Sequence, residues 1–111
     1  MPRATIDVLL AACARAELRL VSKLLRRDGS LVDKSDSEGC TPLAVACVNG
    51  HESTARLLLG KGATVDLARN DGCTPLIIAC QNGHESTARL LLDKGATVDL
   101  ARNDGCTPLI I

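Results

Sequence analysis

The sequence contains no phenylalanine, tyrosine or tryptophan, although 46% of its 111 residues are hydrophobic. The core must therefore be built from Leu, Ile, Val, Ala and Cys side chains, which suit closely packed helices. Aromatic rings are also the usual platforms for stacked bases and frequent anchors of protein interfaces. Their absence argues against a protein that binds single-stranded nucleic acid.

An excess of charge of either sign is missing as well, because 13 Lys and Arg residues balance 13 Asp and Glu residues. Such a chain does not predict strong binding to nucleic acid or to an anionic membrane surface. No hydrophobic run approaches the roughly 20 residues needed to cross a bilayer. The segment LLAAC, residues 9–13, resembles a lipoprotein cleavage site, but Asp7 interrupts the short apolar region before it. We expect a first helix there, no nucleic-acid or membrane partner, and a soluble protein.

What the sequence does contain is an internal repeat. The pentapeptide GCTPL begins at Gly39, Gly72 and Gly105, and residues 49–78 match residues 82–111 at 29 of 30 positions. A fixed period of roughly 20 to 50 residues is typical of solenoid proteins. We divide the single domain, residues 1–111, into a divergent N-terminal repeat (about 3–35), two full repeats (36–68 and 69–101) and a partial fourth repeat (102–111).

Within one repeat, local signals predict two helices. Thr74 is suited to cap a helix N-terminus and Pro75 to occupy the first helical position, so the first helix should run to about Gln81. Asn82-Gly83 should end it. The second helix should cover HESTARLLLDK, residues 84–94, with an exposed i, i+4 ion pair near its start and a glycine at its end. The next ten residues predict an extended, hairpin-like connection.

The unit DGCTPLIIACQNGHESTARLLLDKGATVD resembles an ankyrin repeat in its Gly-x-Thr-Pro-Leu start, Gly-His junction, triple Leu and Gly-Ala end. This resemblance implies an all-α fold: an ankyrin-type α-solenoid of stacked helix-turn-helix repeats with hairpin-like connecting loops, used mainly to bind proteins. Two departures from the family pattern are present. The His that commonly follows Thr-Pro-Leu is replaced by Ala44, Ile77 and Ile110. The Asp that often opens the hairpin is present at Asp36 but becomes Arg69 and Arg102.

Six cysteines raise the question of a disulfide or a metal site. Equivalent positions in stacked helices lie roughly 8 to 10 Å apart, too far for a disulfide. No CxxC pair occurs and neither His has zinc-ligand spacing, so we expect no metal and no cofactor. Cys47 and Cys80 are interpreted as small buried fillers. Cys40, Cys73 and Cys106 are expected to be accessible free thiols, which favours an intracellular location, cytoplasmic or nuclear.

The two histidines lie two residues before a serine, at His51 and His84. A nucleophilic site would also need an orienting acid, an oxyanion site and a pocket, and a duplicated His-x-Ser fragment supplies none of these. We expect each imidazole to be satisfied by nearby backbone at the start of a helix, and we expect no enzymatic activity.

Candidate partner-binding residues follow from the positions that the ankyrin family leaves variable, on the hairpin tips and the exposed side of the first helix. In the second repeat they are Ser37, Glu38, Cys40, Val48 and Asn49, and in the third Arg69, Asn70, Cys73, Gln81 and Asn82.

The sequence thus favours a non-enzymatic protein–protein interaction module, a scaffold or adaptor that binds a protein on its hairpin tips and concave first-helix face. Two alternatives remain: a fragment of a larger protein whose repeats recruit substrate or regulate an enzymatic domain, and a synthetic or duplicated array without a dedicated partner. Arg19, Lys23, Arg26 and Arg27 would give the first repeat the polar outer face of a terminal repeat. The unfinished C-terminal segment, ending at Ile111, is expected to fray or to self-associate.

Overall fold

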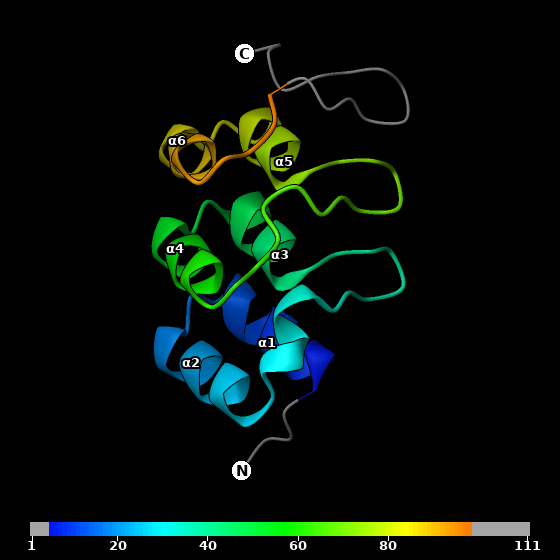
Figure 1. The fold of residues 1–111 in the computed structure, drawn as a ribbon, viewed down its shortest axis with the longest axis vertical. Helices are drawn as coiled ribbons and strands as arrows, with labels where there is room; N and C mark the ends of the chain where they lie inside the picture. Colours follow the sequence, from blue (N-terminus) through cyan, green and yellow to red (C-terminus); the bar gives the residue numbers. More distant parts are fainter. Residues whose placement is uncertain (1–4, 99–111) are drawn as a thin grey trace.

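The computed structural model describes residues 5–98, which form three helix pairs stacked in chain order (Figure 1). The first helices of the pairs are α1 (Ile6–Ala14), α3 (Pro42–Asn49) and α5 (Pro75–Gln81), and the second helices are α2 (Leu18–Arg27), α4 (Glu52–Gly60) and α6 (Glu85–Asp93). A short 3-10 helix, η1 (Gly29–Asp33), follows α2. First helices pack on first helices and second helices on second helices, so the structure has two helical layers.

The predicted all-α solenoid is therefore confirmed, and no strand occurs in residues 5–98. None of the helices in this range is long and apolar enough to span a bilayer. The predictions for the partial fourth repeat, for Cys106 and for self-association through the C-terminal segment concern residues outside the described range.

Each first helix begins at a threonine cap. The hydroxyl oxygens of Thr41 and Thr74 accept hydrogen bonds from the amide three residues onward, at 3.2 and 3.3 Å, and a proline occupies the first helical turn in both cases. Thr5 caps α1 in the same way at 3.4 Å. The cap satisfies an amide that has no partner inside the helix. The predicted start of α5 is confirmed, and the divergent first repeat keeps the same signal.

Small side chains allow the first helices to pack closely. Cys13, Ala46 and Ala79 occupy equivalent positions in α1, α3 and α5, and all three are 0% exposed. Cys47 is likewise a buried filler, as predicted, whereas Cys80 is half-buried. Close packing of this kind gains dispersion energy from many short contacts. An aromatic ring at any of these positions would force neighbouring first helices apart.

The histidines join one helix pair to the next. Nε2 of His84 lies 2.9 Å from the carbonyl oxygen of Val48 in α3, and Nε2 of His51 lies 2.9 Å from the carbonyl oxygen of Ala14 in α1. The prediction of a backbone partner is confirmed, but the partner belongs to the preceding pair and is not local. Gly50 makes room for the His84 ring, because a Cβ there would lie 2.5 Å from Nδ1.

Aspartates make a second connection between successive pairs. The carboxylate of Asp33 accepts from the backbone amide and the hydroxyl of Thr64, at 2.8 and 2.5 Å. Asp66 and Thr97 repeat this contact at 3.0 and 2.6 Å. These contacts hold the segment after each second helix at a constant position relative to the next repeat.

Candidate protein-binding surface

The loops that precede α3 and α5 are tight hairpin turns, and they project from one side of the stack (Figure 1). In the first, the amide of Gly39 donates to Asp36 O at 3.0 Å, and the amide of Asp36 donates to Cys40 O at 3.2 Å. The Asp36 carboxylate also accepts from the amides of Glu38 and Cys40, at 2.9 and 3.0 Å. The Asp36 side chain therefore stabilises the turn by accepting hydrogen bonds from two of its backbone amides.

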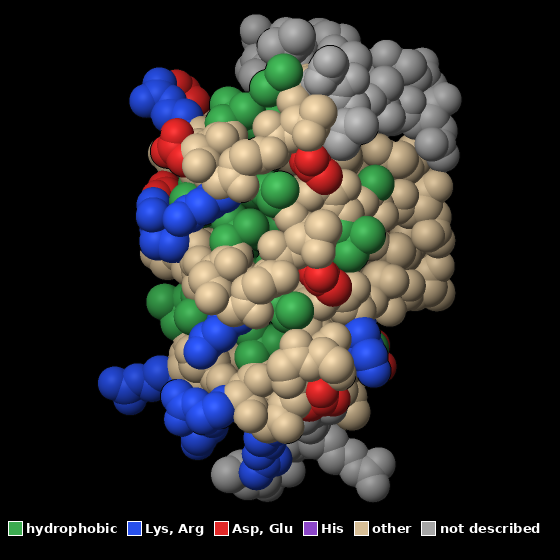
Figure 2. Space-filling model, in the orientation of Figure 1, with side chains coloured by type: hydrophobic (Ala, Val, Ile, Leu, Met, Phe, Trp, Pro, Cys, Tyr) green, Lys and Arg blue, Asp and Glu red, His purple; other side chains and the backbone are tan. Residues whose placement is uncertain are grey.

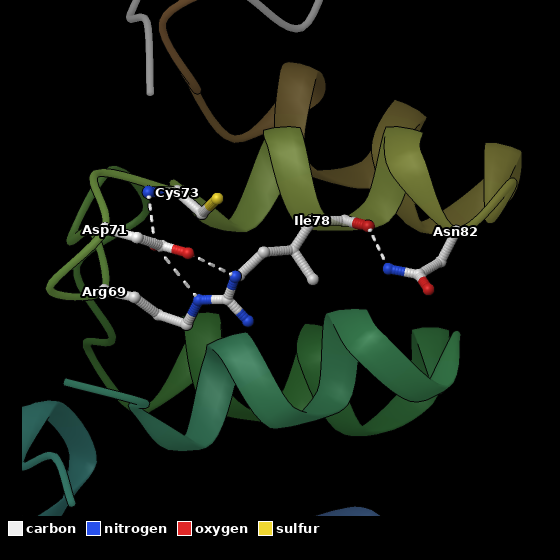
Figure 3. A network of polar contacts seen from close by, with 5 residues as sticks. All are labelled: Arg69, Asp71, Cys73, Ile78 and Asn82. Atoms are coloured by element: carbon white, nitrogen blue, oxygen red, sulfur yellow. Dashed lines mark hydrogen bonds and ion pairs between the residues drawn. The ribbon is translucent and has the colours of Figure 1, made fainter. Parts of the chain in front are cut away.

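The second turn achieves the same result with different residues. Arg69 stands where the first turn has Asp36, and Asp71, two residues later, accepts from the amide of Cys73 at 3.0 Å. The Arg69 guanidinium donates to both Asp71 carboxylate oxygens, at 3.3 and 2.8 Å, as Figure 3 shows. These hydrogen bonds lower the pKa of Asp71 to about 2 and raise the pKa of Arg69. The departure from the family pattern at Arg69 is thus compensated inside the turn.

The two turns are hydrogen-bonded to each other. The backbone amide of Asn70 donates to Glu38 O at 3.0 Å, and its side-chain amide donates to Ser37 O at 2.9 Å. Gly39 permits this approach, because its φ is +83° and a Cβ would lie 2.6 Å from Asn70 Oδ1 and 2.8 Å from Asn70 N. The turns therefore form one continuous polar surface across two repeats.

This surface, the hairpin-tip surface, contains a hollow of about 350 Å³. The hollow is lined by Ser37, Glu38, Arg69, Asn70 and Asp71. The structure thus brings together four predicted candidates from two repeats. Asp71 was not among the predicted candidates, because these were the positions that the ankyrin family leaves variable. The Arg-x-Asp spacing of residues 69–71 could have indicated that Asp71 pairs with Arg69.

Four further candidates, Val48, Asn49, Gln81 and Asn82, lie elsewhere, at the C-terminal ends of α3 and α5. Val48 is 39% exposed, and Gln81 is exposed. Asn49 and Asn82 donate their side-chain amides to the carbonyl four residues earlier, at 2.9 and 2.7 Å, so each caps its own helix end. Figure 3 shows Asn82 at the opposite end of α5 from Arg69, about 10 Å of helix away. The structure therefore separates the candidates into the hairpin-tip surface and this helix-end group.

The cysteine candidates are less accessible than expected. Cys73 is 1% exposed, so the expectation of an accessible thiol is wrong there, because the side chain turns under its own loop into the core. Cys40 is half-buried, and burial raises its pKa, with a further rise from Asp36 nearby. Burial also raises the pKa of Cys13 and of Cys47 to about 12. All cysteines in residues 5–98 are free, and none of these thiols is activated as a nucleophile.

No cluster of three or more His, Cys, Asp or Glu side chains in the described range is arranged to hold a metal ion. Residues 43–92 match the pattern of a protein family described as ankyrin repeats (many copies). No curated protein matches the chain significantly. The match covers most of α3, all of α4 and α5, and most of α6, and it includes the Thr74 cap and both stacking histidines, His51 and His84. This match and the all-α stack of helix pairs are both consistent with the predicted ankyrin repeat fold.

Proposed function

We propose that this protein is a non-enzymatic scaffold or adaptor that binds a protein partner through the hairpin-tip surface. Ankyrin repeats are generally protein–protein interaction modules. The observation that carries the proposal is the pair of hydrogen bonds from Asn70 to Ser37 O and Glu38 O, at 2.9 and 3.0 Å. These hydrogen bonds order the two turns in the free protein, so binding a partner does not lose the conformational entropy of ordering them.

The side chains available on this surface favour polar recognition. The Glu38 side chain is exposed and the Arg69 guanidinium is paired with Asp71, so side chains of both charge signs lie on this surface. The helix-end group extends the same proposal to a second contact area through Val48 and Gln81. The imidazoles stack helix pairs together, which supports a structural and not a catalytic use of His51 and His84. Free thiols fit a reducing compartment, and we propose an intracellular, cytoplasmic location.

The test uses two variants, one for each contact area, and each variant carries two substitutions to arginine. Ser37→Arg with Glu38→Arg alters the hairpin-tip surface, and Val48→Arg with Gln81→Arg alters the helix-end group. Within residues 5–98 none of these four side chains makes a hydrogen bond, and the Ser37 contact with Asn70 uses the backbone carbonyl. The wild-type chain is used to capture partners from its native cell, and each captured protein is purified and titrated against all three chains.

We expect the hairpin-tip variant to weaken binding of a purified partner at least tenfold, with helical circular dichroism unchanged. A partner that binds both variants like the wild-type chain would contradict the proposed surface. Loss confined to the helix-end variant would move the site to the other end of α3 and α5.

A further inference from the structure

Three cations form an unpaired stripe along α2. Arg19, Lys23 and Arg26 follow one another at spacings of four and three residues, which places them on one face of the helix. All three are exposed, and within residues 5–98 none of them makes an ion pair. Figure 2 shows Lys and Arg side chains gathered over α2, at the lower left. The chain as a whole has no net charge, so its composition does not reveal this local excess of positive charge.

The stripe is a departure from the repeat. In α4 the residue equivalent to Arg19 is Glu52, which pairs with Arg56 at 2.9 Å, and the residue equivalent to Arg26 is Leu59. The same Glu–Arg pair recurs in α6 at 2.8 Å. Residues 1–35 carry seven basic and four acidic residues, a net charge of +3, whereas residues 36–111 carry a net charge of −3. The basic character therefore belongs to the first repeat alone.

The stripe borders a groove between α2 and α4, of about 480 Å³. Two leucines provide apolar contact area in it: Leu18, which is 39% exposed, and Leu57, which is half-buried. Arg19, Lys23 and Arg26 line the same groove. An apolar floor beside a row of cations offers two kinds of contact to one ligand. The polar outer face predicted for a terminal repeat needs only exposed charges. It does not explain why these cations line a groove that the first and second helix pairs form together.

We propose that this groove, the α2–α4 groove, binds an extended acidic peptide segment of a partner protein. Carboxylates of the peptide would contact Arg19, Lys23 and Arg26, and an apolar side chain would lie on Leu18 and Leu57. The ten residues of α2 span about 15 Å, which an extended chain covers with about five residues. Nucleic acid fits less well, because its phosphate backbone has no aliphatic side chain for the leucine floor and the protein has no aromatic ring for its bases.

This site is separate from the hairpin-tip surface. The second helices lie on one side of the stack and the hairpin turns project from the other (Figure 1). The protein would thus hold two segments at once, one on each side, and loss of one site should leave the other unaffected.

The test uses a fluorescein-labelled peptide of about eight residues, in which Glu predominates and Leu occurs at every third position. Binding to the full chain is measured by fluorescence anisotropy at low and high salt. Arg19→Glu is the informative variant, because it places at this position the acid that α4 and α6 have, four residues before a cation. It should keep the helix intact while lowering the charge of the stripe from three positive charges to one.

We expect the wild-type chain to bind the peptide in a salt-dependent manner, and Arg19→Glu to weaken binding about tenfold or more. The control Arg89→Glu makes the same charge change on α6, where Arg89 is 76% exposed, and should bind within about threefold of wild type. A peptide with Gln in place of Glu should not bind.

Three results would overturn the proposal. The first is equal binding by Arg19→Glu and the wild-type chain. The second is equal loss in Arg19→Glu and Arg89→Glu, which would show a general effect of net charge. The third is displacement of the peptide by a single-stranded oligonucleotide, or by anionic vesicles, at lower concentration than unlabelled peptide requires, which would assign the groove to that ligand.

Discussion

Alanine at Gly50 tests the contact that stacks one helix pair on the next, and alanine at Gly83 is its matched control. The two glycines occupy equivalent positions, and both have left-handed backbone, with φ of 67° and 73°. Both substitutions therefore carry the steric cost of a Cβ in that region, roughly 1–2 kcal/mol. At Gly50 the new Cβ meets Nδ1 of His84 at 2.5 Å, whereas no atom of the residues that the structure describes lies within 4 Å of a Cβ at Gly83.

The difference between the two variants measures the histidine contact. To relieve the overlap, the His84 ring must move, and Nε2 then loses its position 2.9 Å from Val48 O. A typical hydrogen bond contributes about 0.5–1.5 kcal/mol net. We expect Gly50→Ala to lower the free energy of unfolding by about 1 kcal/mol more than Gly83→Ala.

The assay is urea unfolding followed by helical circular dichroism, which gives the free energy of unfolding and its dependence on urea for each variant. A third change, His84→Ala, removes the ring. In that background, Gly50→Ala and Gly83→Ala should cost the same. Two results would refute this explanation of the stacking. One is an equal loss of unfolding free energy in Gly50→Ala and Gly83→Ala when His84 is present. The other is a larger loss in Gly50→Ala that remains after His84→Ala.

Two further predictions concern titratable groups. Because hydrogen bonds from Arg69 hold the pKa of Asp71 at about 2, below its unfolded value of about 4, their stabilising effect is complete above about pH 4 and is lost as the pH falls through about 2. Arg69→Met should move the Asp71 titration midpoint, followed by carbon NMR, upward toward 4; an unchanged midpoint would contradict the pairing. Buried Cys13 and Cys47, with pKa values of about 12, should react with iodoacetamide at about pH 8 much more slowly than half-buried Cys40. Mass spectrometry of the modified peptides gives the order, urea should abolish the difference, and equal native rates would exclude the burial described for these thiols.

The sequence predicted most of the fold because its signals are local. A threonine followed by proline marks a helix start whichever neighbours surround it, and Thr74 and Pro75 begin α5 as predicted. The Glu85–Arg89 pair needs only helical spacing and is present at 2.8 Å. The repeat period and these caps were enough to place α5 and α6 within one or two residues.

The candidate site was predicted only in part, because its geometry depends on contacts between repeats. Variable positions identified Ser37 and Asn70, but not that the Asn70 amide joins the two turns. Nor did they distinguish Cys73, which is buried, from Cys40, which is half-buried, although the two positions are equivalent. Burial of this kind depends on which atoms cover a residue in space.

The sequence by itself determined the helix pairs, their order and the ankyrin-type stack, since caps, breaks and apolar spacing act over a few residues. Only the tertiary structure decided which surfaces exist. It brought the turns before α3 and α5 into one hydrogen-bonded surface, gave each histidine a carbonyl in the preceding pair, and set the cations of α2 beside Leu57 of α4 in the α2–α4 groove. These contacts join residues about 30 or more positions apart, and their distances follow from how closely small side chains allow the repeats to pack.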